Sequence, residues 1–302
     1  MSIEIVDDRL ADLVDPAASV EQLATGGIWT EGPVYLPEGH PDGPATLFSD
    51  IPNNRICRWS EADGFSVYRT DAEYTNGHTL DHDGRVVSCS HGHRRLERTE
   101  LDGSVTELVA HYQGRRFNSP NDVVVASDGA IWFTDPPYGI ISDHEGHAAE
   151  SEIGVHYVFR FEPATGALTA VTDLLIDPNG LAFSPDESIL YVSDTSAARL
   201  KDEGGGQHNI LAFDVVGGTA LANPRVFAEI EPGVPDGFRV TSKGWILTSA
   251  ADGIHVYDPD GLRLGRIPVP EVVSNCCFGG PDGLTLFITA TSSLYRIPLR
   301  SN

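Results

Sequence analysis

The chain has 302 residues, with 44 acidic and 20 basic side chains and a formal net charge of −24. This excess of carboxylates disfavours nucleic acid, whose phosphates are neutralised by lysine and arginine, and it disfavours an anionic membrane surface. Hydrophobic residues make up 40% of the chain, which is enough for a large core, while 31 glycines and 20 prolines favour a turn-rich, all-β protein. We therefore expect neither nucleic acid nor a membrane among its partners.

The N-terminal segment and the cysteines indicate a reducing compartment. Residues 1–14 are acidic and lack the basic segment and apolar run of a secretory signal. No stretch reaches the ~18 apolar residues of a membrane span. None of the cysteines forms a C-x-x-C pair, and the adjacent Cys276 and Cys277 are poorly placed for a disulfide. We expect a cytoplasmic protein, and the sequence leaves open whether it is a monomer or a homodimer.

Six apolar strands along the chain each open on a carboxylate or an amide, and each is followed by a turn and a second strand. These openers recur roughly every 40 to 60 residues. They are Glu31, Asn76, Asn121, Asn179, Asp236 and Asn275. A period of this length, with strand signals and no convincing helix, is typical of a β-propeller. We predict a single domain over residues 1–302, an all-β, six-bladed β-propeller with a central metal site.

The second and third strands of each repeat follow in chain order. The predicted second strands cover residues 46–50, 85–91, 130–135, 189–194, 245–250 and 286–290, and the predicted third strands cover 54–60, 94–101, 155–163, 209–216, 254–261 and 293–299. Turn residues such as Asp-Gly and Pro-Asp-Gly separate the first two strands, because they tolerate the left-handed backbone of a tight hairpin. Four strands per blade are plausible for most repeats.

The last repeat ends at Leu299, too early to supply its own outer strand. We expect the segment Val20–Ala24 to fill that place and to close the ring with the opposite end of the chain, which would remove exposed sheet edges. Two long polar loops, residues 139–153 and 196–209, interrupt the regular pattern. Loops of this length are usually functional or mobile, so one of them is a candidate lid over a site, with a solvated loop as the alternative.

A propeller brings the first strand of every blade to the central channel, so the openers should converge near one mouth. Glu31, Asn121, Asn179 and Asp236 would then offer carboxylate and amide oxygens to one point. Such hard ligands favour Ca²⁺, Mg²⁺ or Mn²⁺ over a thiolate zinc site. A single Asn-Gly or Asp-Gly is more often a turn residue, but a turn has no need to open the inner strand of every repeat.

The motifs around these openers resemble those of the gluconolactonase/regucalcin-like family of six-bladed lactonases, also called the senescence-marker-protein family. The matching segments are EGPVY with LFSDIPNNRICRW, RFNSPNDVVV with DGAIWFTDPPYGI, DPNGLAFSPDESILYVSD, and VPDGFRV with GWILTSAADGIHVYDP. They cover most of residues 25–295. The segments SPND and FTDPPYG are similar to those of the bacterial gluconolactonase branch.

The resemblance implies a lactone hydrolase that opens glucono-1,5-lactone or a related aldonolactone. The family's metal ligands carry over to Glu31, Asn121, Asn179 and Asp236, which are four of the six openers. The implied cofactor is a divalent metal ion, with Ca²⁺ first and Mg²⁺, Mn²⁺ or Zn²⁺ as alternatives. It would polarise the lactone carbonyl, and Asp236 would activate the attacking water as the catalytic residue.

A second set of residues forms the predicted substrate contacts. It consists of Asn76, His78, His91, Ser119, Tyr138 and Asn275. His91 ends a second strand where other repeats carry Asp50, Asp135 or Asp194, which places an imidazole near the channel. Asp135 and Asp194 are candidates to orient the amide ligands or to form turns.

One position departs from the animal branch of the family. Ser119 stands where that branch has a sugar-binding arginine, and Arg115 or Arg116 is a possible substitute from the loop. The departure leaves the sugar preference open.

Two alternatives also remain for the function of the protein. One is a lactonase, esterase or phosphotriesterase with a non-sugar substrate, and the other is a non-catalytic calcium-binding or protein-binding propeller.

Overall fold

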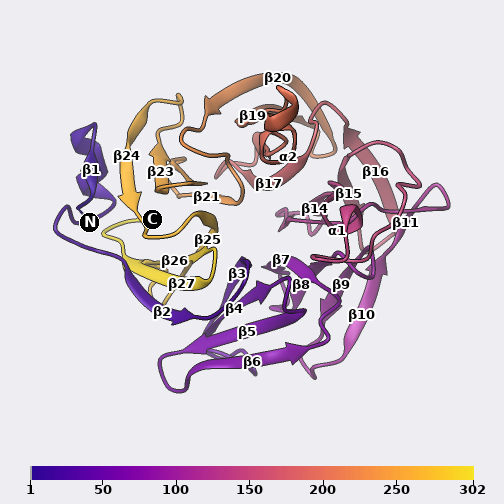
Figure 1. Ribbon diagram of the computed structural model, residues 1–302, viewed down its shortest axis with the longest axis horizontal. Coiled ribbons are helices and arrows are strands. Elements are labelled where there is room, and N and C mark those ends of the chain that lie inside the picture. The colour runs from indigo at the N-terminus through magenta and orange to yellow at the C-terminus, as the bar shows by residue number, and fades with distance from the viewer. Residues whose placement is uncertain (1) are drawn as a thin grey trace.

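Six antiparallel sheets surround a central channel in the computed structural model, which describes residues 2–302 (Figure 1). Each sheet is one blade, and the first strand of each repeat lies innermost, while strands from the N-terminal segment lie outermost in blades 5 and 6. The arrangement confirms the predicted all-β, six-bladed β-propeller.

The first three blades follow the predicted repeats. Blade 1 contains β3 (Thr30–Leu36), β4 (Ala45–Asp50), β5 (Arg55–Ser60) and β6 (Gly64–Thr70). Blade 2 contains β7 (Thr75–Leu80), β8 (Val86–Ser90), β9 (Arg95–Thr99) and β10 (Val105–Val109). The short hairpin of β11 (His111–Tyr112) and β12 (Arg115–Arg116) follows. Blade 3 contains β13 (Val123–Val125), β14 (Ile131–Thr134), β15 (Val158–Glu162) and β16 (Ala167–Thr172).

The other three blades complete the ring. Blade 4 contains β17 (Pro178–Phe183), β18 (Ile189–Asp194), β19 (Asn209–Val216) and β20 (Ala220–Glu229). Blade 5 contains β21 (Phe238–Val240), β22 (Ile246–Ala250), β23 (Gly253–Tyr257) and β24 (Arg263–Pro268). Blade 6 contains β25 (Val273–Gly279), β26 (Thr285–Ala290) and β27 (Ser293–Pro298).

The N-terminal segment contributes to two blades. Strand β2 (Glu21–Thr25) pairs with β27 as the outer strand of blade 6, so it fills the place expected for Val20–Ala24 with a shift of one residue. Strand β1 (Glu4–Ile5) adds a fifth strand to blade 5 beside β24, and the 3₁₀ helix η1 (Asp8–Asp12) packs against it. The Arg300 amide donates to the Leu13 carbonyl (2.7 Å), so both chain ends meet at one side of the ring (Figure 1).

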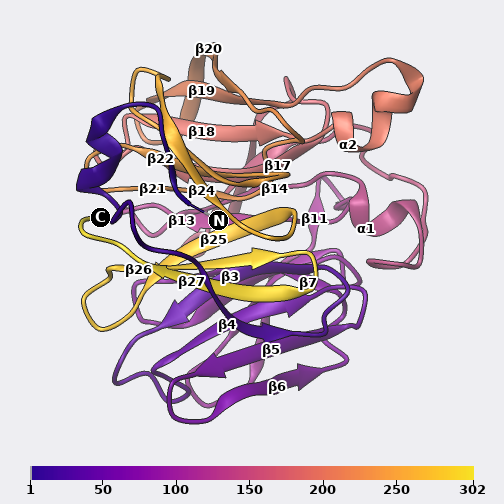
Figure 2. The ribbon, with the colours of Figure 1, turned by 60° about the vertical axis from the view of Figure 1, so that its left-hand side comes forward.

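Two short helical segments occur in the long polar loops, where the sequence predicted no helix. They are α1 (Tyr138–Ile141), and α2 (Ala197–Leu200) with η2 (Lys201–Glu203). Figure 2 shows α1 and α2 projecting from the same side of the propeller. No helix within residues 2–302 is long and apolar enough to cross a membrane.

The hydrophobic core is divided among the interfaces between neighbouring blades. One example lies between blades 2 and 3, where Phe117, Phe133 and Phe159 pack with ring centroids 5.1 to 5.3 Å apart. Burial of each such side chain contributes roughly 1.5–3 kcal/mol. Because apolar residues fill the spaces between blades, the polar inner-strand residues are left facing the channel.

Irregular register occurs where the inner strands carry their openers. The ladder is interrupted between Glu31 and Val34, between Thr75 and His78, and between Pro178 and Leu181. In blades 3 and 5 the ladder begins only at Val123 and Phe238, two residues after the opener. Such bulges re-aim side chains and are common beside functional sites. Because of them, the side chains of the openers do not have to follow the regular alternation between the two faces of the sheet.

Candidate functional site

A cavity of about 160 Å³ lies at one end of the central channel. Its wall combines inner-strand openers with residues from the two long loops. The lining residues are Trp29, Glu31, Ile51, Asn76, Asn121, Tyr138, Glu145, Asn179, Thr195, Ala198 and Asp236. The structure therefore brings together all four predicted metal ligands, together with Asn76 and Tyr138.

The carboxylate of Glu31 is buried and has two hydrogen-bond donors. Its Oε2 accepts from the Gly32 amide (2.5 Å) and from Asn275 Nδ2 (3.0 Å). Burial, followed by the charge of Asp122, raises the pKa of Glu31 to about 8. Neither donor carries a formal charge, so the ionised form of Glu31 lacks a directly bonded cation among its hydrogen-bond partners.

Asp236 is a second buried carboxyl in the same cavity. Burial, followed by the charges of Glu31 and Asp122, raises the pKa of Asp236 well above its usual value. A hydrogen bond with Asn179 opposes this shift, and the Asp236 amide donates to Ser249 Oγ (2.7 Å). The two carboxyls therefore repel each other when both are ionised, and a cation between them would relieve that repulsion.

Asp122 is a functional candidate that the sequence reasoning missed. Its Oδ1 accepts from the Val123 amide (2.9 Å), while Oδ2 lies 3.9 Å from Arg239 Nη1. Burial raises the pKa of Asp122, and its charge acts on both Glu31 and Asp236. The only sequence signal was its place directly after Asn121 in the motif PND, which gives no information about the side chain's direction.

Asn275 supports Glu31 without lining the cavity. A Cβ placed on Gly237 would lie 1.9 Å from the Asn275 side chain, so only glycine allows blades 5 and 6 to approach this closely. The Asn275 Oδ1 accepts from the Cys276 amide (2.8 Å), which directs Nδ2 toward Glu31. The structure thus places this predicted substrate contact behind a predicted ligand.

Asp135 and Asp194 hold the backbone that leads into the amide ligands. The Asp135 carboxylate accepts from the Asn118 and Ser119 amides (2.9 and 2.8 Å), just before Asn121. The Asp194 carboxylate accepts from the Ile176 amide (2.7 Å) before Asn179, and from the Ser196 amide (3.0 Å). Both aspartates therefore position strand entries rather than the amide groups themselves.

The two long loops both border the cavity. Glu145 comes from the first loop, Tyr138 directly precedes that loop, and Ala198 comes from the second. Burial and the nearby charges of Asp177 and Asp236 raise the pKa of Tyr138 well above its usual value, so its hydroxyl stays protonated. Burial also raises the pKa of Glu145.

The remaining predicted substrate contacts lie outside the cavity lining. His78 is buried between Ser49 Oγ (2.9 Å from Nε2) and Ser88 Oγ (2.7 Å from Nδ1). The Ser119 hydroxyl donates to the Pro136 carbonyl (2.6 Å) and accepts from the Gly139 amide (2.9 Å), so it fixes the start of the first loop. His91 stands behind Asn76, with its Nε2 3.4 Å from Asn76 Nδ2.

The two arginines considered as substitutes at Ser119 lie elsewhere. Arg115 and Arg116 form the exposed strand β12, outside the cavity lining. Arg116 Nη2 donates to the His93 carbonyl (3.0 Å).

The donor set fits a divalent cation. It offers oxygen atoms only, with two carboxyls to balance a double charge and two amides to add neutral donors. Asn76 Oδ1, a buried oxygen of another residue in the same wall, is not part of this set and has no hydrogen-bond partner within residues 2–302. No cluster of three His, Cys, Asp or Glu suited to a metal occurs among those residues. Glu31, Asn121, Asn179 and Asp236 would hold such an ion.

A larger cavity of about 330 Å³ lies between blades 1 and 6. Tyr35, Trp59 and Phe287 form much of its wall, and it contains none of the predicted site residues. Its arginines are already paired, since Arg58 bonds Asp63 and Arg296 bonds Glu21. The titratable groups that perturb one another are instead at the channel mouth, so we place the functional site there.

Comparison with known proteins gives a consistent result. Residues 29–292 match the family described as SMP-30/Gluconolactonase/LRE-like region. The gluconolactonase of Zymomonas mobilis is 33% identical over 313 aligned residues, which cover 96% of this chain and 83% of that protein. Pentonolactonase XacC of Haloferax volcanii is 29% identical, with coverage of 86% and 80%. The solved structure of XC5397, a gluconolactonase from Xanthomonas campestris, has a TM-score of 0.90 at 39% identity and covers 99% of this chain and 95% of that one.

Proposed function

Because the chain belongs to the SMP-30/gluconolactonase/LRE-like family, we propose that it is a lactone hydrolase that opens glucono-1,5-lactone or a related aldonolactone with the help of a divalent metal ion. The observation that carries this proposal is the convergence of Glu31, Asn121, Asn179 and Asp236 on one cavity. A relative named as a gluconolactonase and another named as a pentonolactonase support a sugar lactone as the substrate.

The metal ion, which we expect to be Ca²⁺, would supply Lewis acidity to the lactone carbonyl and stabilise the developing oxyanion. Glu31 and Asp236 provide the negative charge that holds it, and Asn121 and Asn179 provide neutral oxygens. Mg²⁺, Mn²⁺ and Zn²⁺ are alternative ions for an oxygen-rich set of this kind.

Asp236 is the proposed general base. Its carboxyl lies in the cavity wall beside the other proposed ligands, where its ionised form could accept a proton from a water that enters the cavity. The water oxygen then bonds to the carbonyl carbon, the ring C–O bond breaks, and the leaving alkoxide takes up a proton. The product is the open-chain hydroxy acid, with one water consumed.

A lactone panel followed with a pH indicator tests the proposal. Glucono-1,5-lactone, other aldonolactones and unsubstituted lactones are assayed against the spontaneous rate, with and without a chelator. We expect acid release on at least one aldonolactone, its loss with the chelator and its recovery when Ca²⁺ is added back. If no lactone is opened faster than in buffer and the chelator changes nothing, the proposed function is wrong.

A further inference from the structure

One wall of the cavity carries an acceptor oxygen that the metal set does not use. Asn76 opens β7 and lines the cavity, and its backbone carbonyl is held by Ser49 Oγ (2.8 Å). Its side-chain Oδ1 is buried without a hydrogen-bond partner among residues 2–302. An unpaired buried acceptor is unfavourable, so a donor that reached this oxygen would stabilise it.

The orientation of the Asn76 amide follows from the hydrogen bonds of His91. His91 Nδ1 lies 2.9 Å from the Glu145 carbonyl oxygen, which can only accept, so Nδ1 carries the hydrogen. Burial lowers the pKa of His91 to about 4, so the ring is neutral near pH 7 and Nε2 is an acceptor. Asn76 Nδ2, 3.4 Å away, therefore donates to Nε2, which leaves Oδ1 as the end of the amide without a partner among residues 2–302.

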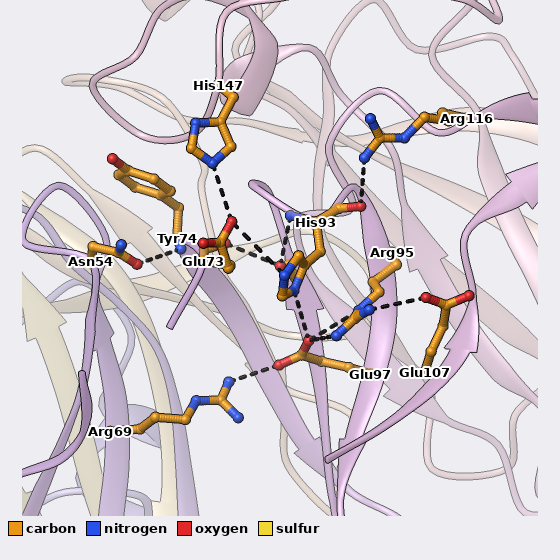
Figure 3. A network of polar contacts seen from close by, with 11 residues as sticks. Asn54, Arg69, Glu73, Tyr74, His93, Arg95, Glu97, Glu107, Arg116 and His147 are labelled. Carbon is orange, nitrogen blue, oxygen red and sulfur yellow. Dashed lines mark hydrogen bonds and ion pairs between the residues drawn. The ribbon is translucent and has the colours of Figure 1, made fainter. Parts of the chain in front are cut away.

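His91 is itself held by the first long loop. A Cβ on Gly139 would lie 2.5 Å from the His91 Cβ, so only glycine lets the loop pack this closely against it. The same loop is attached to blade 2 at a second point, where His147 Nε2 lies 3.1 Å from Glu73 Oε2 (Figure 3). The His147 ring also meets Tyr74 edge-on, with centroids 5.3 Å apart.

We propose that Asn76 Oδ1 accepts a hydrogen bond from a substrate hydroxyl, and that His91 is a positioning residue that fixes the amide in the required orientation. The inference rests on the proposed lactonase function. It deepens that function because it makes Asn76 the residue that favours hydroxylated lactones over unsubstituted ones. An aldonolactone carries several O–H donors on its ring carbons, whereas δ-valerolactone carries none.

The experiment compares kcat/KM for glucono-1,5-lactone and δ-valerolactone in wild type, Asn76→Leu, His91→Phe and the double variant. If δ-valerolactone is not turned over, its inhibition constant replaces its kcat/KM. We expect Asn76→Leu to lower the value for the hydroxylated lactone about tenfold, as for one lost hydrogen bond, and to change that for δ-valerolactone less than about twofold. His91→Phe should act in the same direction, and the double variant should lose no more than Asn76→Leu.

Two controls separate positioning from structure. His147→Phe removes the other loop-to-blade histidine contact while keeping the ring on Tyr74, and it should leave the substrate ratio unchanged. Ca²⁺ affinity, measured by calorimetry, should be the same in Asn76→Leu and wild type, because Asn76 is assigned to the substrate.

Three results would overturn the inference. Equal losses on both lactones would make Asn76 or His91 merely structural, additive losses in the double variant would separate His91 from Asn76, and weaker Ca²⁺ binding in Asn76→Leu would make it a metal ligand. Failure of wild type to open any lactone is a different outcome, which removes the proposed function itself.

Discussion

Glu31 in the channel and Glu97 on β9 are equally buried, at 3% and 2% exposure, but they have different partners. Glu97 bonds Arg69 Nη2 (2.7 Å) and Arg95 Nη2 (3.1 Å), and His93 Nδ1 lies 3.5 Å away (Figure 3). Glu31 instead receives two neutral donors and lies near the charge of Asp122.

The difference distinguishes two uses of a buried carboxylate. In blade 2 the chain supplies the cations itself, so the charge of Glu97 is balanced when the protein folds. At the channel mouth, Glu31 and Asp236 have no arginine or lysine as a hydrogen-bond partner among the described residues, and their charges repel. A cation from solution would supply positive charge that the chain does not bond to these carboxyls, which makes the channel rather than blade 2 the candidate metal site.

The largest effect should follow from replacing Asp236. Asp236→Ala removes a proposed ligand and the proposed base together, so turnover of glucono-1,5-lactone should fall by about a thousandfold or more. The matched control is Glu97→Gln, which removes a buried carboxylate outside the cavity and should retain most turnover per folded molecule. Full activity in Asp236→Ala would show that the site is wrongly assigned.

Glu97→Gln should in turn destabilise the fold, by about 3 kcal/mol, because Arg69 and Arg95 lose their shared carboxylate. The measurement is urea unfolding followed by tryptophan fluorescence in the presence of a chelator. An unchanged midpoint would mean that both arginines are adequately hydrated at the blade surface. Glu97 would then not be an example of a buried carboxylate that stabilises the fold, as the comparison with Glu31 assumes.

Glu31→Gln should change the stability in the opposite direction to Glu97→Gln when no metal is present. A carboxyl with a pKa raised to about 8 binds its proton more tightly in the folded chain than in the unfolded one, so stability is lost as pH rises from about 4.5 to 8. Removing that charge should therefore raise stability without metal at pH 8 by about 1–2 kcal/mol, while it weakens the stabilisation given by Ca²⁺. Thermal unfolding with chelator and with Ca²⁺ measures both effects. A fall in metal-free stability would contradict the description of Glu31.

The fold was predictable because each blade repeats a local pattern. Alternating apolar strands and Asp-Gly turns specify hairpins from neighbouring residues alone, and the six openers marked where the inner strands begin. The sequence also predicted that four of these openers share a cavity, because equivalent positions of a closed ring converge. They are Glu31, Asn121, Asn179 and Asp236.

The roles of the other residues depend on contacts that sequence spacing does not contain. His78 is two residues after Asn76 and would share its face in a regular strand, but the bulge between Thr75 and His78 breaks the alternation. Asn275 reaches Glu31 across 244 positions of the chain, only because the ring closes. The hydrogen bond from His91 to the Glu145 carbonyl depends on the conformation of the first long loop. The other repeats have no equivalent of this loop from which its conformation could be predicted.

His78 extends the comparison to a buried titratable group whose hydrogen-bond partners come from the chain, as those of Glu97 do, but which is neutral rather than charged. Burial lowers the pKa of His78 to about 3, so the unfolded chain takes up a proton below about pH 6.5 while the folded chain does not. Stability should therefore fall as pH drops below 6.5, with a contribution from His78 of about 1 kcal/mol between pH 6.5 and 5.5. His78→Gln keeps a polar group between Ser49 and Ser88 and removes the titration, so its unfolding free energy should change less steeply over this range. Equal slopes for the two proteins would show that His78 does not remain neutral in the folded state, and the neutrality of His91 would then need a separate measurement.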